Sequence, residues 1–133
     1  MKQCILLMAL VFGALITGFA QQDPVGEHLF PPELILAHQY EIDLSADQKA
    51  AIKSLVKVAQ KEFIDLEWEL EDQATAFFEM IAKANIEEAQ TLQQLEKVLD
   101  LENKIKRKQL TLMIKLKNLL SPAQQNQLDN FRG

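Results

Sequence analysis

The apolar residues between Ala46 and Lys83 recur every three or four positions, which is the spacing of one face of a helix. They are Ile52, Val56, Ala59, Phe63, Leu66, Leu70, Ala74, Phe77 and Ile81, and the stripe is widened by Leu55, Ile64 and Phe78. No glycine or proline interrupts this stretch. The pattern predicts one long helix with a stripe close to the heptad repeat of coiled coils, wide enough to contact more than one neighbour.

A second stretch of helical spacing runs from Ile86 to about Leu119. Its apolar positions are Leu92, Leu95, Val98, Leu99, Ile105, Leu112, Met113, Leu116 and Leu119, and it is interrupted by Glu102 and Gln109. Between the two stretches, Asn85 is followed three residues later by Glu88, the spacing of a helix N-cap and its N3 partner. We therefore expect a tight turn at residues 83–86. One continuous helix is the alternative, because no glycine or proline marks the break.

The predicted fold is all-α, a long antiparallel helix hairpin with short flanking helices. Each arm has about 35 residues and would be about 50 Å long. The hairpin would place the acidic run at 62–72 opposite the basic residues at 97–108. Because each helix has only one partner, a hairpin alone leaves much of these wide stripes bare. The pattern thus predicts a homodimer, most simply with two-fold symmetry.

Two similar segments bracket the hairpin, Leu44-Ser45-Ala46-Asp47-Gln48 and Leu120-Ser121-Pro122-Ala123-Gln124. In each, a serine at the N-cap can accept from the backbone N–H three residues on, and a glutamine there can reach back to the serine N–H. These are capping boxes, so one helix begins after Ser45 and a short one after Ser121. The last helix would cover residues 123–131.

The N-terminal residues 1–20 resemble a secretory signal peptide. Lys2 gives a positive start, residues 5–16 are almost wholly apolar, and Gly18-Phe19-Ala20 has small residues where cleavage would occur. A membrane anchor is the alternative, but the apolar run is shorter than the ~20 residues that a spanning helix needs. Residues 21–32 contain three of the chain's four prolines, Pro24, Pro31 and Pro32, and we interpret this stretch as a flexible leader. Residues 33–133 would form the single domain.

A short helix over residues 33–40 would open that domain, with Leu34, Ile35 and Ala37 as its apolar side. The whole chain carries 14 basic and 19 acidic residues, and removal of the signal peptide would take away Lys2 and the only cysteine, Cys4. An acidic chain is a poor nucleic-acid binder, because phosphate contacts provide most of that affinity. The mature chain would have no disulfide or thiolate chemistry.

No phosphate-binding loop, nucleophile elbow or zinc-protease motif is present, so we do not expect an enzyme. The residues that could hold a transition metal are His28, His38, Glu33 and Glu41. The two histidines lack the i, i+4 spacing of a helical pair, which favours a solvated His28, a partly packed His38 and no cofactor.

A basic cluster is interleaved with apolar residues near the end of the second long helix. Its candidate members for contacts with unfolded chains are Lys104, Arg107, Lys108, Met113 and Lys115. Surfaces that bind many partners tend to be adaptable and to contain methionine. The alternative is a solvated outer face held by salt bridges.

The two bracketing segments resemble the paired Leu-Thr-x-x-Gln motifs of the Spy/CpxP family, with serine in place of threonine. The motif residues are Leu44, Ser45, Gln48, Leu120, Ser121 and Gln124. Residues 30–34, Phe-Pro-Pro-Glu-Leu, followed by His38 and Gln39, are also similar to the stretch before the first motif in the family's metal-sensing branch.

The resemblance implies a cradle-shaped helical homodimer in the periplasm. Spy-like members hold unfolded proteins without ATP, and stress-response members act with a membrane-bound sensor. We therefore expect a periplasmic chaperone or envelope-stress protein whose clients are unfolded proteins. The alternative is a heavy-metal sensor that binds nickel, cobalt, copper or zinc and signals to a membrane partner.

Overall fold

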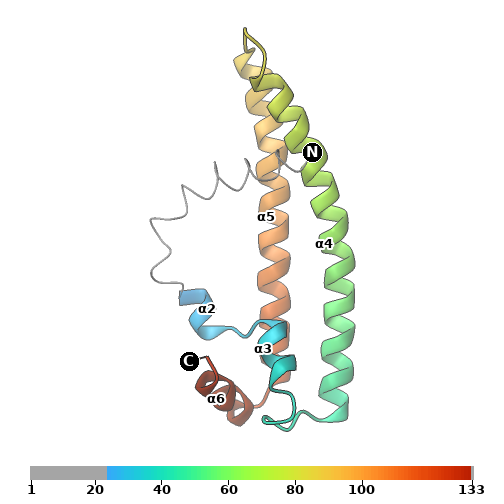
Figure 1. Cartoon of the computed structure of the whole chain (residues 1–133), viewed down its shortest axis with the longest axis vertical. Coiled ribbons are helices and arrows are strands. Elements are labelled where there is room, and N and C mark those ends of the chain that lie inside the picture. The colour runs from blue at the N-terminus through green and yellow to red at the C-terminus, as the bar shows by residue number, and fades with distance from the viewer. Residues whose placement is uncertain (1–23, 133) are drawn as a thin grey trace.

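Five helices make up the part of the chain that the structure describes, residues 24–132 of a computed structural model (Figure 1). They are α2 (Pro24–His28), α3 (Pro32–Ala37), α4 (Ala46–Ile81), α5 (Glu88–Leu119) and α6 (Pro122–Asn130). No strand occurs in that range, so the all-α prediction is confirmed. The predicted signal peptide at residues 1–20 lies outside the described residues. No helix between residues 24 and 132 combines the length and the apolar character that crossing a membrane requires.

The two long helices α4 and α5 run antiparallel and pack against each other, as the hairpin prediction requires (Figure 1). Helix α4 ends at Ile81, and α5 begins at Glu88. The predicted cap at Asn85 is wrong, because the carboxylate of Glu87 accepts from the backbone N–H of Gln90 at 2.8 Å. Packed helix axes lie 8–10 Å apart, and the chain uses all of residues 82–87 to cross that distance before the new helix starts.

The buried face of α5, the seam along which it packs on α4, differs near its start from the predicted apolar stripe and is more polar. Thr91 and Gln94 are buried, whereas Leu92 is 51% exposed. The Gln94 side-chain nitrogen donates to both the backbone oxygen (2.8 Å) and the side-chain oxygen (2.9 Å) of Gln73. A buried amide is tolerated when its polar atoms have such partners. Gln94 is thus a buried polar residue that the pattern did not predict, and of the two predicted interruptions Glu102 is half-buried and Gln109 is exposed.

The main hydrophobic core lies at the open end of the hairpin, where α3 and α6 meet the start of α4 and the end of α5 (Figure 1). Its buried members are Phe30, Ile35, Ile42, Leu44, Ile52, Leu116, Leu120 and Leu128. The helix predicted at residues 33–40 is shorter, because residues 38–43 form a turn in which Asp43 has a φ of 54°. Aspartate enters this left-handed region more readily than most residues.

The described part of the predicted leader, residues 24–32, includes α2 and contacts the C-terminal part of the chain. Residues 24–28 are helical, and Phe30 is only 1% exposed. The Arg132 guanidinium donates to the backbone oxygens of Gly26 and Leu29 and lies over the Phe30 ring, 4.6 Å from its centroid. The Lys117 ammonium donates to the backbone oxygen of His28 at 2.7 Å. Two cations from the C-terminal part of the chain, Lys117 and Arg132, thus bind backbone oxygens of residues 26–29.

The expected pairing of the acidic run with the basic residues of α5 occurs at one position in residues 24–132. Lys108 and Glu62 form an ion pair at 2.6 Å. The carboxylates at 65, 67, 69, 71 and 72 are exposed and form no ion pair with a described residue. Glu62 and Lys108 lie at the same level of the hairpin, but the other charged side chains of the two runs are exposed to solvent.

Candidate functional site

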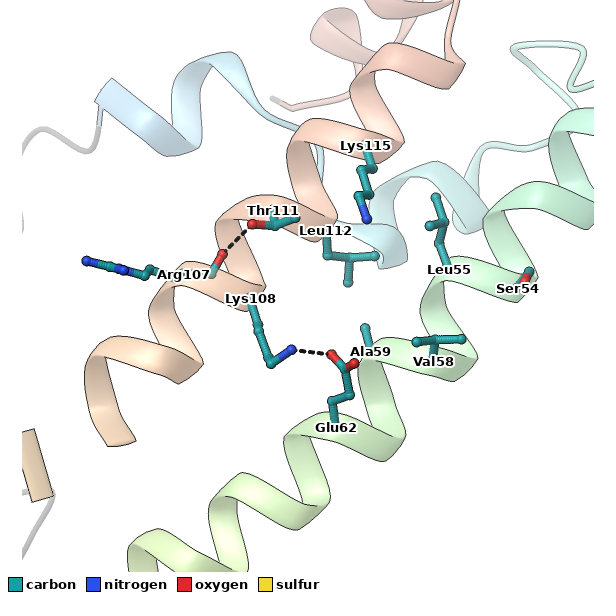
Figure 2. Close-up of a pocket in the computed structure, with 10 residues that line it drawn as sticks. All are labelled: Ser54, Leu55, Val58, Ala59, Glu62, Arg107, Lys108, Thr111, Leu112 and Lys115. Atoms are coloured by element: carbon teal, nitrogen blue, oxygen red, sulfur yellow. Dashed lines mark hydrogen bonds and ion pairs between the residues drawn. The ribbon is translucent and has the colours of Figure 1, made fainter. Parts of the chain in front are cut away.

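A groove runs between α4 and α5 in the half of the hairpin nearer its open end (Figure 2). It encloses about 340 Å³. Its walls come from one stretch of α4, residues 54–62, and one of α5, residues 107–115. We call this feature the interhelical groove. Its volume is at the lower end of what small-ligand pockets occupy, so it could accept one or two side chains of another molecule.

Part of the groove's lining is apolar. Leu55 and Ala59 on α4 lie across from Leu112 on α5, and Val58 stands at the rim with 58% of its surface exposed. Ala59 is in the helix seam, and its single methyl group leaves space that a larger side chain would fill. A partly exposed apolar hollow of this kind favours contact with apolar groups from outside.

The charges around the groove are mostly positive. The Lys108–Glu62 ion pair spans it at one end, and the Lys115 side chain points toward the space between the helices (Figure 2). Arg107 points away from α4. Neither Arg107 nor Lys115 forms an ion pair with a carboxylate between residues 24 and 132. The three cations and one carboxylate give a local charge of about +2 on a chain whose formal net charge is −5.

The structure brings together part of the client-binding set predicted from the sequence. Arg107, Lys108 and Lys115 all line the interhelical groove. Lys104 is exposed but does not line it. Met113 lies elsewhere on α5 and lines a second hollow of about 510 Å³ that is shared with the leader and the C-terminus.

Sequence reasoning missed the α4 side of the groove. Val58 lies off the main stripe, and Leu55 only widened it. Their position one turn apart, on the side of α4 that also carries Glu62, is the signal that could have found this wall.

The four predicted metal-binding residues do not form one cluster. The His38 ring stacks on Phe131 with centroids 4.0 Å apart and planes at 7°, and its Nδ1 lies 3.6 Å from Glu41 Oε1. His28 and Glu33 are exposed, and neither side chain has an ion pair among the described residues. Across residues 24–132, no three histidine, cysteine, aspartate or glutamate side chains gather closely enough to hold a metal ion.

The six motif residues assemble into one joint at the open end of the hairpin. Both capping boxes form as predicted, with Gln48 N–H donating to Ser45 Oγ at 3.1 Å and Gln124 N–H donating to Ser121 Oγ at 3.1 Å. The leucines of the two motifs, Leu44 and Leu120, are buried in the core beside them.

The two capping boxes are joined through their glutamines. Gln48 Nε2 donates to Gln124 Oε1 at 2.8 Å, and Gln124 Nε2 donates to Gln48 Oε1 at 3.0 Å. Gln48 Nε2 also donates to the backbone oxygen of Leu119, and Gln124 Nε2 donates to that of Ile42. Each amide oxygen meanwhile accepts from the backbone N–H of its own serine.

This joint requires glutamine at both positions. An amide has one acceptor atom and one donor atom, and here both are used by each side chain. A glutamate would keep the capping acceptor but lose the donor, and would place a carboxylate oxygen against a backbone carbonyl. The two motifs thus hold the start of α6 against the start of α4.

No family model, no curated protein and no solved structure matches this chain.

Proposed function

We propose that this protein is a periplasmic chaperone or envelope-stress protein of the Spy/CpxP type, which holds unfolded proteins without ATP. The observation that carries the proposal is the interhelical groove, where apolar side chains of both helices adjoin Lys115, a cation with no carboxylate partner between residues 24 and 132. The paired motifs support the family assignment, because their glutamines have a joint structural role in this chain.

The groove suits a weak and reversible hold. A fully buried apolar side chain contributes about 1.5–3 kcal/mol, and a surface ion pair with Lys115 would add about 0–1 kcal/mol. The upper limit of this sum, about 4 kcal/mol, corresponds to a dissociation constant of about 1 mM, so one contact binds no tighter than that. Several such contacts are therefore needed, and a client that leaves them one at a time can fold while bound.

A homodimer would supply those additional contacts. Large apolar side chains are exposed along both helices of the hairpin, including Ile81, Leu110 and Ile114. A two-fold pairing of hairpins would cover part of this surface and give two grooves on one particle. Two linked weak sites bind one long client more tightly than either does alone.

The test is suppression of aggregation of a chemically denatured client at near-stoichiometric ratio. We expect the wild-type protein to suppress it, and Val58→Ser to reduce the suppression several-fold because it removes the exposed rim of the groove. Leu92→Ser is the matched control, since Leu92 is similarly exposed but does not line the groove. Absence of suppression by the wild-type protein, under conditions where it is dimeric, would contradict the proposal.

A further inference from the structure

The outer face of α4 carries the largest exposed side chain of the hairpin. Trp68, the only tryptophan of the chain, has 66% of its surface exposed, and Ile64 one turn before it has 54%. Trp68 lies two residues from both Leu66 and Leu70, and so about half a turn round the helix from the seam. It therefore faces away from α5, and it makes no ring contact within residues 24–132.

The surroundings of Trp68 are acidic. Residues three and four positions away are its neighbours on the helix surface, and these are Ile64, Asp65, Glu71 and Asp72. The three carboxylates are exposed, and none has a hydrogen bond or ion pair with a described residue. No lysine or arginine occurs between Glu62 and Asp72. We call Ile64, Trp68 and these three carboxylates the α4 ridge.

We propose that the α4 ridge is an interaction surface for a cationic amphipathic helix of another protein. The exposed tryptophan and isoleucine, spaced i, i+4, would pack between apolar side chains of that helix, as ridges of one helix pack into grooves of another. Exposed tryptophan is enriched among the residues that dominate binding energy in protein interfaces. The lysines or arginines of the partner would pair with the carboxylates, and one cation could lie over the indole ring.

The charge of the ridge argues against other occupants. A two-fold pairing of the ridge with itself would bring the carboxylates of two copies together, which is unfavourable. The same carboxylates would repel the anionic headgroups of a membrane surface. A cationic protein segment is the occupant whose charge complements the ridge, and this inference does not depend on the proposed chaperone function.

The single tryptophan makes the binding directly measurable. The purified protein is titrated with a synthetic amphipathic helix made of leucine and lysine, and tryptophan emission is recorded. We expect a saturable blue shift as Trp68 leaves water, weakened by added salt because the charges are exposed. The same peptide with glutamate in place of lysine should produce no shift.

Two sets of variants locate the site. Asp65→Asn/Asp72→Asn should weaken binding about tenfold, whereas Glu96→Gln/Asp100→Asn removes two exposed carboxylates from α5 and should leave it nearly unchanged. Trp68→Ala, followed through a labelled peptide, should weaken binding by about tenfold or more. Because Trp68 is exposed, the Trp68→Ala variant should have the same circular dichroism spectrum and melting temperature as the wild type.

Three results would overturn the proposal. One is the absence of any shift with the lysine peptide. Another is equal weakening by the two double variants, which would mean attraction to net charge alone. The third is a blue shift on concentrating the protein without peptide, which would make a second copy of the chain the occupant.

Discussion

The side-chain amides of Gln48 and Gln124 form two reciprocal hydrogen bonds, at 2.8 and 3.0 Å, although the residues are 76 positions apart in the chain. Each glutamine also closes the capping box of its own helix. The starts of α4 and α6 are therefore held together by the same two side chains that cap them.

Replacement of one amide by a carboxylate should break this joint. We expect Gln124→Glu to lower the free energy of unfolding by about 2–4 kcal/mol, because Gln124 is buried and the change removes the donor to the backbone oxygen of Ile42 and to the side-chain oxygen of Gln48. Urea unfolding followed by circular dichroism measures the change.

Gln127→Glu is the matched control, because Gln127 lies on the same helix and is exposed. The free energy of unfolding of Gln127→Glu should stay within about 0.5 kcal/mol of the wild-type value. Equal losses in both variants would mean that added negative charge, and not the joint, is responsible.

Removal of the Arg132 guanidinium should free the N-terminal segment. In Arg132→Gln we expect faster proteolytic cleavage between residues 24 and 30, because the backbone oxygens of Gly26 and Leu29 and the ring of Phe30 lose their contacts. Cleavage sites identified by mass spectrometry provide the measurement.

Arg107→Gln serves as the control for that experiment, since Arg107 is exposed and makes no side-chain contact with the segment. If the digestion pattern of Arg107→Gln matches that of Arg132→Gln, the contacts of Arg132 have no role in holding residues 24–30.

His38 should act through packing on Phe131 and not as a metal ligand. Calorimetric titration with nickel, copper and zinc should show no binding tighter than millimolar, since between residues 24 and 132 the one possible co-ligand beside His38 is Glu41. His38→Ala should lower the free energy of unfolding by about 0.5–1.5 kcal/mol through loss of the stacked ring. Micromolar metal binding that disappears in His38→Ala would contradict this and favour the metal-sensing alternative.

The hairpin and its caps could be predicted because their causes are local. Apolar spacing sets the length of α4, and the serine–glutamine pairs set where α4 and α6 begin. The cap of α5 could not be placed from residue type, because Asn85 is the usual kind of N-cap residue and yet the Glu87 carboxylate caps the helix by accepting from the backbone N–H of Gln90.

The parts that depend on distant contacts were beyond the sequence pattern. The burial of Gln94 rests on Gln73 in the other helix, and the backbone contacts of residues 26 and 29 come from Arg132 near the other end of the chain. Likewise, three of the predicted basic residues line the groove, but its apolar wall on α4 emerges only when the helices are docked.

Site-specific photo-crosslinking tests the central claim, that the interhelical groove holds unfolded chains, most directly. A photo-reactive amino acid is placed at position 58 on the rim of the groove, or at position 92, which is similarly exposed but outside it. Each protein is irradiated with a denatured client and with the same client in its folded state. We expect adducts from position 58 with the denatured client only, and few from position 92. Equal adducts from both positions, or none from position 58 while aggregation is suppressed, would place client binding elsewhere on the molecule.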